Sequence, residues 1–266
     1  MQEQPDAANA GTGRRLANKV AVVTGASRGI GRAIALRLAA EGARVVVNHP
    51  AEDEVAESTL ADIRSQGGQA LAVSADVSDA NQVAAMFATT GEMYGGVDVL
   101  VNNAGICPFV EWFDLTEALW DRVHGVNLKG AFLCSQHASR LMRDQGRGGR
   151  IISISSISAL VGGSFQTHYT PTKAGVRSLM QSLAIVLGPY GITCNSILPG
   201  TILTDINRAH YEDPATMKRD TGRVPLGRLG QPDDIAGVAA FLASDDARYV
   251  NGAEILVDGG LFVNLQ

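Results

Sequence analysis

Short apolar, β-branched runs alternate with amphipathic helical stretches along most of this chain. The spacing of the apolar residues predicts seven strands, at 20–24, 44–48, 70–73, 97–101, 150–155, 192–197 and 254–257. It predicts helices at 29–41, 53–66, 79–94, 116–144, 166–188 and 232–244. Strands that are apolar throughout belong in a parallel sheet covered on both faces, and right-handed crossovers make it doubly wound. The sequence therefore predicts an α/β, single-domain Rossmann fold: a seven-stranded parallel sheet with helices on both faces.

The 266 residues are expected to form one folded domain behind a short tail. Residues 1–18 are polar and contain proline and glycine, which predicts a disordered tail and no secretion signal. The domain is expected over 19–266. The segment at about 198–230 breaks the strand–helix alternation and is rich in proline, glycine, threonine and charge, so we expect a substrate lid there.

Composition argues against several classes of function. The formal net charge is −5 and basic residues form no block, so neither nucleic acid nor a membrane is an expected partner. No apolar run approaches the roughly 20 residues that cross a bilayer. Cys107, Cys134 and Cys194 are odd in number and far apart, which predicts neither disulfides nor a metal site. We expect a protein of the reducing cytoplasm, with these cysteines as small core residues.

A glycine-rich turn, Thr24-Gly25-Ala26-Ser27-Arg28-Gly29-Ile30-Gly31, joins the first predicted strand to the first helix. Glycines let a ligand approach the backbone, and the amides at a helix N-terminus favour a phosphate. Such a turn is weak evidence when it stands alone, and its spacing differs from the common Gly-x-Gly-x-x-Gly. Its place after the first of several parallel strands nevertheless predicts a dinucleotide ligand.

Tyr169 and Lys173 are spaced so that both side chains project from one helix face, one turn apart. A phenol titrates near pH ~10, and a neighbouring ammonium favours the phenolate and lowers that pKa. The pair would then act as an acid–base group at a hydroxyl. An isolated Tyr-x-x-x-Lys is more often a half-buried tyrosine beside a solvated lysine, so the interpretation needs support from the rest of the chain.

Further motifs along the chain give that support. In order, they are Asn102-Asn103-Ala104-Gly105 after the fourth strand, Asn127 in the long fourth helix, Ser156 after the fifth strand, and Pro199-Gly200 at the end of the sixth. Together with Tyr169 and Lys173, this order resembles the short-chain dehydrogenase/reductase family from Lys19 onward.

The resemblance implies hydride transfer between a carbinol carbon and a nicotinamide ring. It implies that Tyr169 is the acid–base group, and that Lys173 lowers its pKa and holds the nicotinamide ribose. Ser156 would hydrogen-bond the reacting oxygen, and Asn127 would hold a water that links Lys173 to solvent. For Asn127 alone, a buried side chain in a bent helix is an equally good interpretation.

The resemblance also implies dinucleotide contacts at the carboxyl ends of the strands. They are Gly25, Ser27, Arg28, Gly29, Ile30, Asn48, Asp76, Val77, Asn102, Ala104, Gly105, Tyr169, Lys173, Pro199, Gly200, Thr201 and Ile202, with Asp76 and Val77 at adenine, Asn102 near a ribose and Ile202 over the nicotinamide. The second strand ends in Asn48 and His49, where an NAD enzyme usually presents an acidic residue. Because no carboxylate repels a 2'-phosphate and Arg28 can pair with one, we expect NADP, with NAD as a second cofactor.

Four segments, 103–109, 155–163, 166–173 and 256–266, are similar to the branch of the family that oxidises L-rhamnose. This implies oxidation of the anomeric C1 hydroxyl of L-rhamnose, or of a related aldose, to the aldonolactone. A polyol needs several fixed donors and acceptors. The expected sugar contacts are Ser156, Ser158, Gln166, Tyr169, Thr201 and Asn207, with Phe109 and Trp112 as candidates for packing on the C6 methyl or a ring face.

Other functions stay open. A 3-oxoacyl thioester or other carbonyl reductase would use the same scaffold, with Arg147, Arg150, Arg219 and Arg223 as a candidate docking patch for an acidic carrier. A glucose 1-dehydrogenase is the nearest alternative in substrate. A redox sensor that binds NADP without turnover is the non-enzyme alternative, disfavoured because the Tyr and Lys are both present.

A homotetramer is the expected assembly, because the family is commonly tetrameric. The apolar, strand-like segment 261–265 and the long helices at 116–144 and 166–188 are candidate subunit contacts. Docking of the tail within the chain is the alternative.

Overall fold

The computed structural model describes residues 14–51, 54–205, 207–208 and 211–264. Its centre is a seven-stranded sheet in the order β3-β2-β1-β4-β5-β6-β7, with every neighbouring pair parallel. The strands are β1 (Val20–Val23), β2 (Arg44–His49), β3 (Gln69–Ser74), β4 (Val99–Asn102), β5 (Gly149–Ile154), β6 (Ile192–Pro199) and β7 (Glu254–Val257). Because the order reverses between β1 and β4, the sheet is doubly wound, and the predicted fold class is confirmed.

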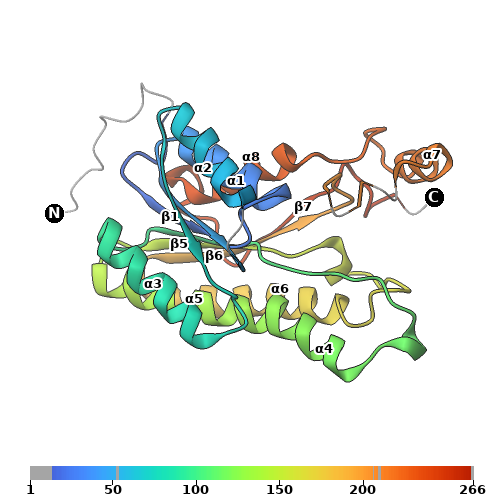
Figure 1. The fold of residues 1–266 in the computed structure, drawn as a ribbon, viewed down its shortest axis with the longest axis horizontal. Helices are drawn as coiled ribbons and strands as arrows, with labels where there is room; N and C mark the ends of the chain where they lie inside the picture. Colours follow the sequence, from blue (N-terminus) through green and yellow to red (C-terminus); the bar gives the residue numbers. More distant parts are fainter. Residues whose placement is uncertain (1–13, 52–53, 206, 209–210, 265–266) are drawn as a thin grey trace.

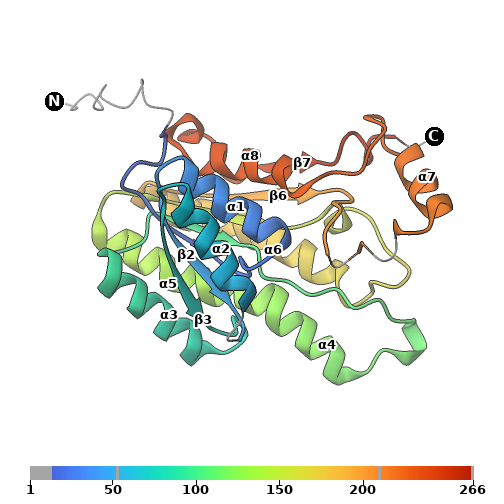
Figure 2. The ribbon, with the colours of Figure 1, turned by 45° about the horizontal axis from the view of Figure 1, so that its top comes forward.

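Helices cover both faces of the sheet, which gives three layers (Figure 1). One layer holds α1 (Gly29–Ala40), α2 (Glu54–Ser65) and α8 (Pro232–Ala243); the other holds α3 (Ala80–Tyr94), α5 (Gly130–Gln145) and α6 (Thr170–Leu187). Two further helices, α4 (Glu117–His124) and α7 (Pro214–Gly222), extend toward one end of the molecule (Figure 2). Among the helices of the described ranges, none has the length and apolar character needed to cross a membrane.

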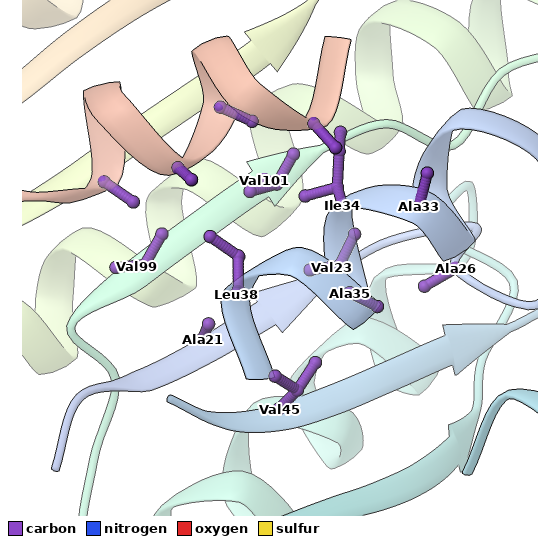
Figure 3. Close-up of a cluster of buried hydrophobic side chains, with 14 of the residues drawn as sticks. Ala21, Val23, Ala26, Ala33, Ile34, Ala35, Leu38, Val45, Val99 and Val101 are labelled. Carbon is purple, nitrogen blue, oxygen red and sulfur yellow. The ribbon is translucent and has the colours of Figure 1, made fainter. Parts of the chain in front are cut away.

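The five central strands, β2, β1, β4, β5 and β6, are buried and fill two apolar cores, one against each helical layer, whereas the outer strands β3 and β7 are partly exposed. Alternate residues of a strand face opposite layers, so Val23 packs in the core under α1 and α8, while Val22 packs in the core under α3, α5 and α6. Figure 3 shows Ile34 and Leu38 of α1 lying over the valines of the neighbouring strands. With both faces covered, the sheet can present polar groups to a ligand only at the strand ends.

The helix predicted at 116–144 is interrupted in the structure. Between α4 and α5, the segment Gly125–Lys129 is π-helical, and Asn127 lies in its middle. Such a bulge inserts one residue into a turn and often marks a functional site. The helix predicted from Gln166 begins only at Thr170, where Pro171 occupies the first turn and fixes the start of α6.

The predicted boundary at Lys19 is too late. Leu16 is fully buried, and its N–H donates to the carbonyl of Glu41 at 2.9 Å. Arg15 donates to both carboxylate oxygens of Glu41, each at 2.7 Å. The folded domain therefore includes Arg14–Asn18, and the rest of the predicted tail lies outside the described residues.

The segment predicted as a lid follows the end of β6 at Pro199 and leads into α8 at Pro232. Ile202 and Gly230 form a parallel bridge, so the two ends of this excursion are held together. The segment contains α7, a helix that was not predicted from the sequence; Asp213 caps it by accepting from the N–H groups of Ala215 and Thr216.

The apolar tail predicted as strand-like is a series of turns as far as Asn264, and 265–266 lie outside the described residues. Asn264 donates to the carbonyl of Arg223 at 3.0 Å, so the tail docks within its own chain. Val263 remains 73% exposed.

Candidate active site

The predicted functional residues gather where the central strands end. The glycine-rich loop follows β1, Asn102 ends β4, Ser156 follows β5, and Pro199 ends β6. All four strands run in the same direction, so these segments meet at one edge of the sheet. In open α/β sheets this is the edge that binds ligands.

The glycine loop forms a cradle for a phosphate group. Gly25 and Gly29 have φ values of +61° and +56°, which favour glycine. A Cβ placed on Gly31 would lie 2.3 Å from the carbonyl oxygen of Gly25 and 2.4 Å from the side-chain Nδ2 of Asn103. The backbone therefore favours glycine at these three positions, and the loop leads into the N-terminus of α1, where amides can meet a phosphate.

Asn48 supports this loop from behind. Its side chain is 1% exposed, accepts from the N–H of Gly25 at 3.3 Å, and donates to the carbonyls of Val73 and Ala75 at 3.2 and 3.0 Å. The Asn48 amide is therefore engaged with backbone groups at the sheet edge, and a contact of this residue with the cofactor stays a prediction. Arg28, the residue before α1, is exposed, and its contact with a 2'-phosphate stays a prediction.

The predicted adenine contacts lie in the loop after β3. Burial alone would raise the pKa of Asp76, but hydrogen bonds from Ser78 and Arg122 lower it overall. The Ser78 hydroxyl donates to this carboxylate at 2.7 Å and Arg122 at 2.8 Å. Val77 is 5% exposed and packs against Gly130. The adenine contact itself stays a prediction.

Asn102 offers an unused acceptor at the same edge. Its amide nitrogen donates to the hydroxyls of Ser135 and Ser153 at 2.9 and 3.2 Å, whereas its Oδ1 is buried and has no hydrogen-bond partner among the described residues. A cavity of about 10 Å³, enough for roughly one water, is lined by Asn102, Asn127 and Lys173. A buried orphan acceptor fits a ribose hydroxyl or an ordered water, so the residues present fit a dinucleotide.

Tyr169 and Lys173 lie together at the start of α6, as predicted. Lys173 Nζ is 5.4 Å from the centre of the Tyr169 ring. The ammonium is buried and donates to the carbonyl of Ile154 at 2.8 Å. The first turn of α6 and the carbonyl of Ile154 at the end of β5 therefore fix the position of the Lys173 amine beside the Tyr169 phenol.

The expected lowering of the Tyr169 pKa by Lys173 is not found. Burial raises the pKa of Tyr169, as does nearby Cys107, while a hydrogen bond with Ser156 lowers it in part. Burial also lowers the pKa of Lys173 to about 8, because a buried ammonium loses its hydration. Desolvation is thus the largest influence on both groups, and both are held closer to their neutral forms.

The serine choice agrees with the geometry. β5 ends at Ile154, and the buried Ser155 hydroxyl donates to the carbonyl of Lys173 at 2.9 Å, so it faces α6. The next residue, Ser156, is half-buried on the Tyr169 side and accepts from the N–H of Ser158 at 3.0 Å. Ser156 is therefore the serine placed to meet a reacting oxygen.

Asn127 is 2% exposed and pairs with the backbone of Ile106. Its Oδ1 accepts from the Ile106 N–H at 2.8 Å, and its Nδ2 donates to the Ile106 carbonyl at 3.0 Å. The π-helical segment thus holds the loop after β4, which includes Gly105, in place beside Lys173.

Cys107 was predicted to lie in the core, and this is wrong. Cys134 and Cys194 are buried, but Cys107 is only partly buried and lies near Tyr169 and Lys173. Gln166 Nε2 donates to its sulfur at 3.4 Å, and Ser158 Oγ donates to Gln166 Oε1 at 3.4 Å. Burial raises the pKa of Cys107 to about 11, so the thiol stays neutral. Its position after the β4 motif was the signal that could have identified it.

On the lid side, Asn207 organises the loop after β6. Its Oδ1 accepts from the Thr204 N–H at 2.8 Å and its Nδ2 donates to the Ile202 carbonyl at 2.9 Å. Ile202 is 7% exposed, and Thr201 is half-buried beside it. Contacts of Thr201 and Asn207 with a sugar stay predictions.

Two aromatic candidates for the sugar, Phe109 and Trp112, are 67% and 57% exposed. They lie in the segment between β4 and α4. Packing of either ring on a sugar also stays a prediction.

A protein-family profile described as Enoyl-(Acyl carrier protein) reductase matches residues 25–262. The L-rhamnose 1-dehydrogenase (NAD(P)(+)) of Azotobacter vinelandii is 58% identical over 94% of this chain and 99% of its own length. The L-rhamnose 1-dehydrogenase (NADP(+)) of Thermoplasma acidophilum is 46% identical over 93% and 98%. A 3-oxoacyl-[acyl-carrier-protein] reductase of Staphylococcus aureus is 44% identical over 92% and 98%.

Solved structures agree with the fold. A protein from Sinorhizobium meliloti, assigned as a short-chain alcohol dehydrogenase, superposes with a TM-score of 0.90 at 40% identity, over 94% of this chain and 98% of that one. A protein from Agrobacterium tumefaciens, assigned as a 2-deoxy-D-gluconate 3-dehydrogenase and solved with bound NADP, gives 0.87 at 38% identity, over 95% and 100%.

Replacing Gly31 with alanine should damage the dinucleotide cradle, since the added methyl collides with the backbone of the loop. We expect Gly31→Ala to raise the Kd for NADP by at least about tenfold, measured by fluorescence titration. Gly91→Ala is the matched control, because nothing lies within 4 Å of its added Cβ and it stands inside α3. Equal NADP affinity in both variants would contradict the proposed cradle.

Proposed function

Because this chain belongs to the short-chain dehydrogenase/reductase family, we propose that it oxidises the anomeric C1 hydroxyl of L-rhamnose, or of a related aldose, to the aldonolactone. It is an NAD(P)-dependent sugar 1-dehydrogenase, an oxidoreductase that acts on a CH–OH donor. The observation that carries the proposal is the meeting of Ser156, Tyr169 and Lys173 at the carboxyl edge of the sheet, in a chain so similar to L-rhamnose 1-dehydrogenases along its length.

In this proposal the side chains orient the sugar and move one proton. When bound, the nicotinamide ring would accept the hydride that leaves C1 of the sugar. Ser156 donates a hydrogen bond to the reacting oxygen, and the Tyr169 phenolate takes the proton of the C1 hydroxyl as the carbonyl of the lactone forms. Lys173, held by the Ile154 carbonyl, lies beside the phenol and supports its charge at the moment of transfer.

The proton then leaves Tyr169 through Lys173 and the cavity beside Asn127, which has room for about one water. Ser158, Gln166, Thr201 and Asn207 are the proposed partners for the remaining hydroxyls of the sugar. Gln166 is supported by its bond to Ser158 and its place next to Cys107.

A role as a carrier-protein reductase is the second candidate, and the placement of the arginines weighs against it. Arg147 and Arg150 lie at the amino end of β5, at the edge of the sheet away from the site, and pair with Asp98 and Asp245. Arg219, on α7, pairs with Asp220. These residues therefore do not form one cationic patch at the mouth of the pocket.

Replacing Tyr169 with phenylalanine should abolish proton transfer while leaving the ring volume intact. We expect Tyr169→Phe to lower kcat for L-rhamnose oxidation by about 10²-fold to 10⁴-fold, with NADP affinity unchanged. In the unmodified protein the oxidation rate should rise with pH, because the base is a phenolate and burial raises the pKa of Tyr169.

Tyr249→Phe is the control, since Tyr249 is fully exposed. The rates are measured for L-rhamnose, D-glucose and, with NADPH, an acetoacetyl thioester. A faster thioester reaction would favour the second candidate, and a Tyr169→Phe enzyme with most of its turnover would reject the mechanism.

NADP is the proposed preferred cofactor, with Arg28 on the 2'-phosphate. Since a charge-assisted bond contributes on the order of 1.5–3 kcal/mol, Arg28→Ala should raise the Kd for NADP by about 10-fold to 100-fold. The Kd for NAD should change less than about threefold, because NAD has no phosphate there. Arg64→Ala, on the exposed end of α2, is the control. An unchanged NADP affinity in Arg28→Ala would remove Arg28 from the site.

A homotetramer in the cytoplasm is proposed as the working form. Apolar side chains on α5 and α6 support this assembly: Phe132, Ile185 and Val186 are 44%, 79% and 63% exposed. Such a concentration of exposed apolar groups is typical of a protein interface. The three free cysteines are consistent with a reducing compartment.

The Ile185→Asp variant should dissociate the assembly, because a carboxylate in an apolar interface loses its hydration. Sedimentation at micromolar concentration should show a tetramer for the unmodified chain and smaller species for Ile185→Asp. Met93→Asp, at a similarly exposed site on α3, is the control. A monomeric unmodified chain would contradict the proposal.

A further inference from the structure

Thr172, between the two proposed catalytic residues, joins three parts of the site. It is fully buried, and its hydroxyl donates to the carbonyl of Tyr169 at 2.6 Å. The same oxygen accepts from Asn127 Nδ2 at 3.2 Å. No step assigned so far uses this side chain.

The direction of these bonds is fixed. A carbonyl only accepts, so the single hydroxyl proton of Thr172 is used on Tyr169, and the hydroxyl can meet Asn127 only as an acceptor. The amide nitrogen of Asn127 therefore has both of its protons engaged, one on Thr172 and one on the carbonyl of Ile106. The Asn127 oxygen is held on the N–H of Ile106 and cannot exchange places with the nitrogen.

One continuous chain of bonds follows from this arrangement. It runs from the loop after β4, through the π-helical segment, to the first turn of α6 that carries Tyr169 and Lys173. The Tyr169 carbonyl also accepts from the N–H of Lys173 at 3.2 Å, so the Thr172 hydroxyl holds the turn that sets the distance between the two side chains.

We propose that Thr172 is a positioning residue for the dehydrogenase reaction: its hydroxyl holds the first turn of α6 against Asn127, and so keeps Tyr169, Lys173 and the cavity beside Asn127 in register. This rests on the proposed function. A small displacement of an acid–base group is costly, since an error of about 1 Å lowers rates by roughly 10²-fold.

Thr172→Val tests this, because it removes the hydroxyl with little change in volume, and Thr172→Ser retains the hydroxyl. We expect Thr172→Val to lower kcat by about 10-fold to 100-fold, with KM for L-rhamnose and Kd for NADP within about threefold. The rising limb of its pH profile, which reports deprotonation of Tyr169, should move by at least about half a pH unit, since Tyr169 and its neighbours change their spacing. Thr172→Ser, which keeps the hydroxyl, should have the kcat and the pH profile of the unmodified protein.

Thr90→Val is the matched control. Thr90 is also fully buried in a helix and donates to a backbone carbonyl, that of Met86 at 2.8 Å, away from the site. It should lose stability as Thr172→Val does, with an unchanged pH profile. Equal kcat and pH profile in Thr172→Val and the unmodified protein would overturn the proposal, as would equal kinetic losses in Thr172→Val and Thr90→Val.

Failure of the proposed function is distinguishable from failure of this inference. If the unmodified protein turns over the acetoacetyl thioester and no sugar, the substrate assignment is wrong, and the same variants are compared on the thioester. A crystal structure of Thr172→Val gives a readout without activity: displacement of Asn127 and of the first turn of α6 supports the proposal, and unmoved positions overturn it.

Discussion

Burial of both faces of the parallel sheet is the constraint on which the rest of this structure depends. Valines and isoleucines fill both cores, so polar side chains that must meet a ligand are left to the ends of the strands. Because all strands run in one direction, their carboxyl ends place Gly25, Asn102, Ser156 and Thr201 at one edge despite their separation in sequence. The fold thus assembles the site before any specific contact is considered.

The same burial controls the chemistry of the site. Lys173 lies in a low-dielectric position with the Ile154 carbonyl as its partner, and Tyr169 lies beside it with Ser156. Desolvation acts on both groups and moves each toward its neutral form. A lysine with a pKa of about 8 is partly deprotonated just above neutrality, so it can accept and release a proton as well as support a charge. This suits a group that relays the proton of an alcohol.

Local patterns in the sequence predicted the strands, the glycine loop and the Tyr169–Lys173 pair, because each depends on neighbours a few residues away. Features that depend on distant partners were missed. Asn48 accepts a hydrogen bond from the Gly25 N–H, and Cys107 accepts one from Gln166. The N–H of Leu16 donates to the carbonyl of Glu41. Periodicity could not show the π-helical segment either, because its cause is the pairing of Asn127 with a loop 21 residues earlier. The pKa of Tyr169 was mispredicted for a related reason, since burial cannot be read from spacing.

The choice among substrates depends on parts of the site that vary within one scaffold. Ser158, Gln166 and Cys107 form a connected wall of hydroxyl, amide and neutral thiol, in which burial keeps the thiol protonated. Such a wall can exchange hydrogen bonds with hydroxyls of a sugar but gives no countercharge to a phosphate or carboxylate. A neutral polyol fits it better than an anionic carrier arm does.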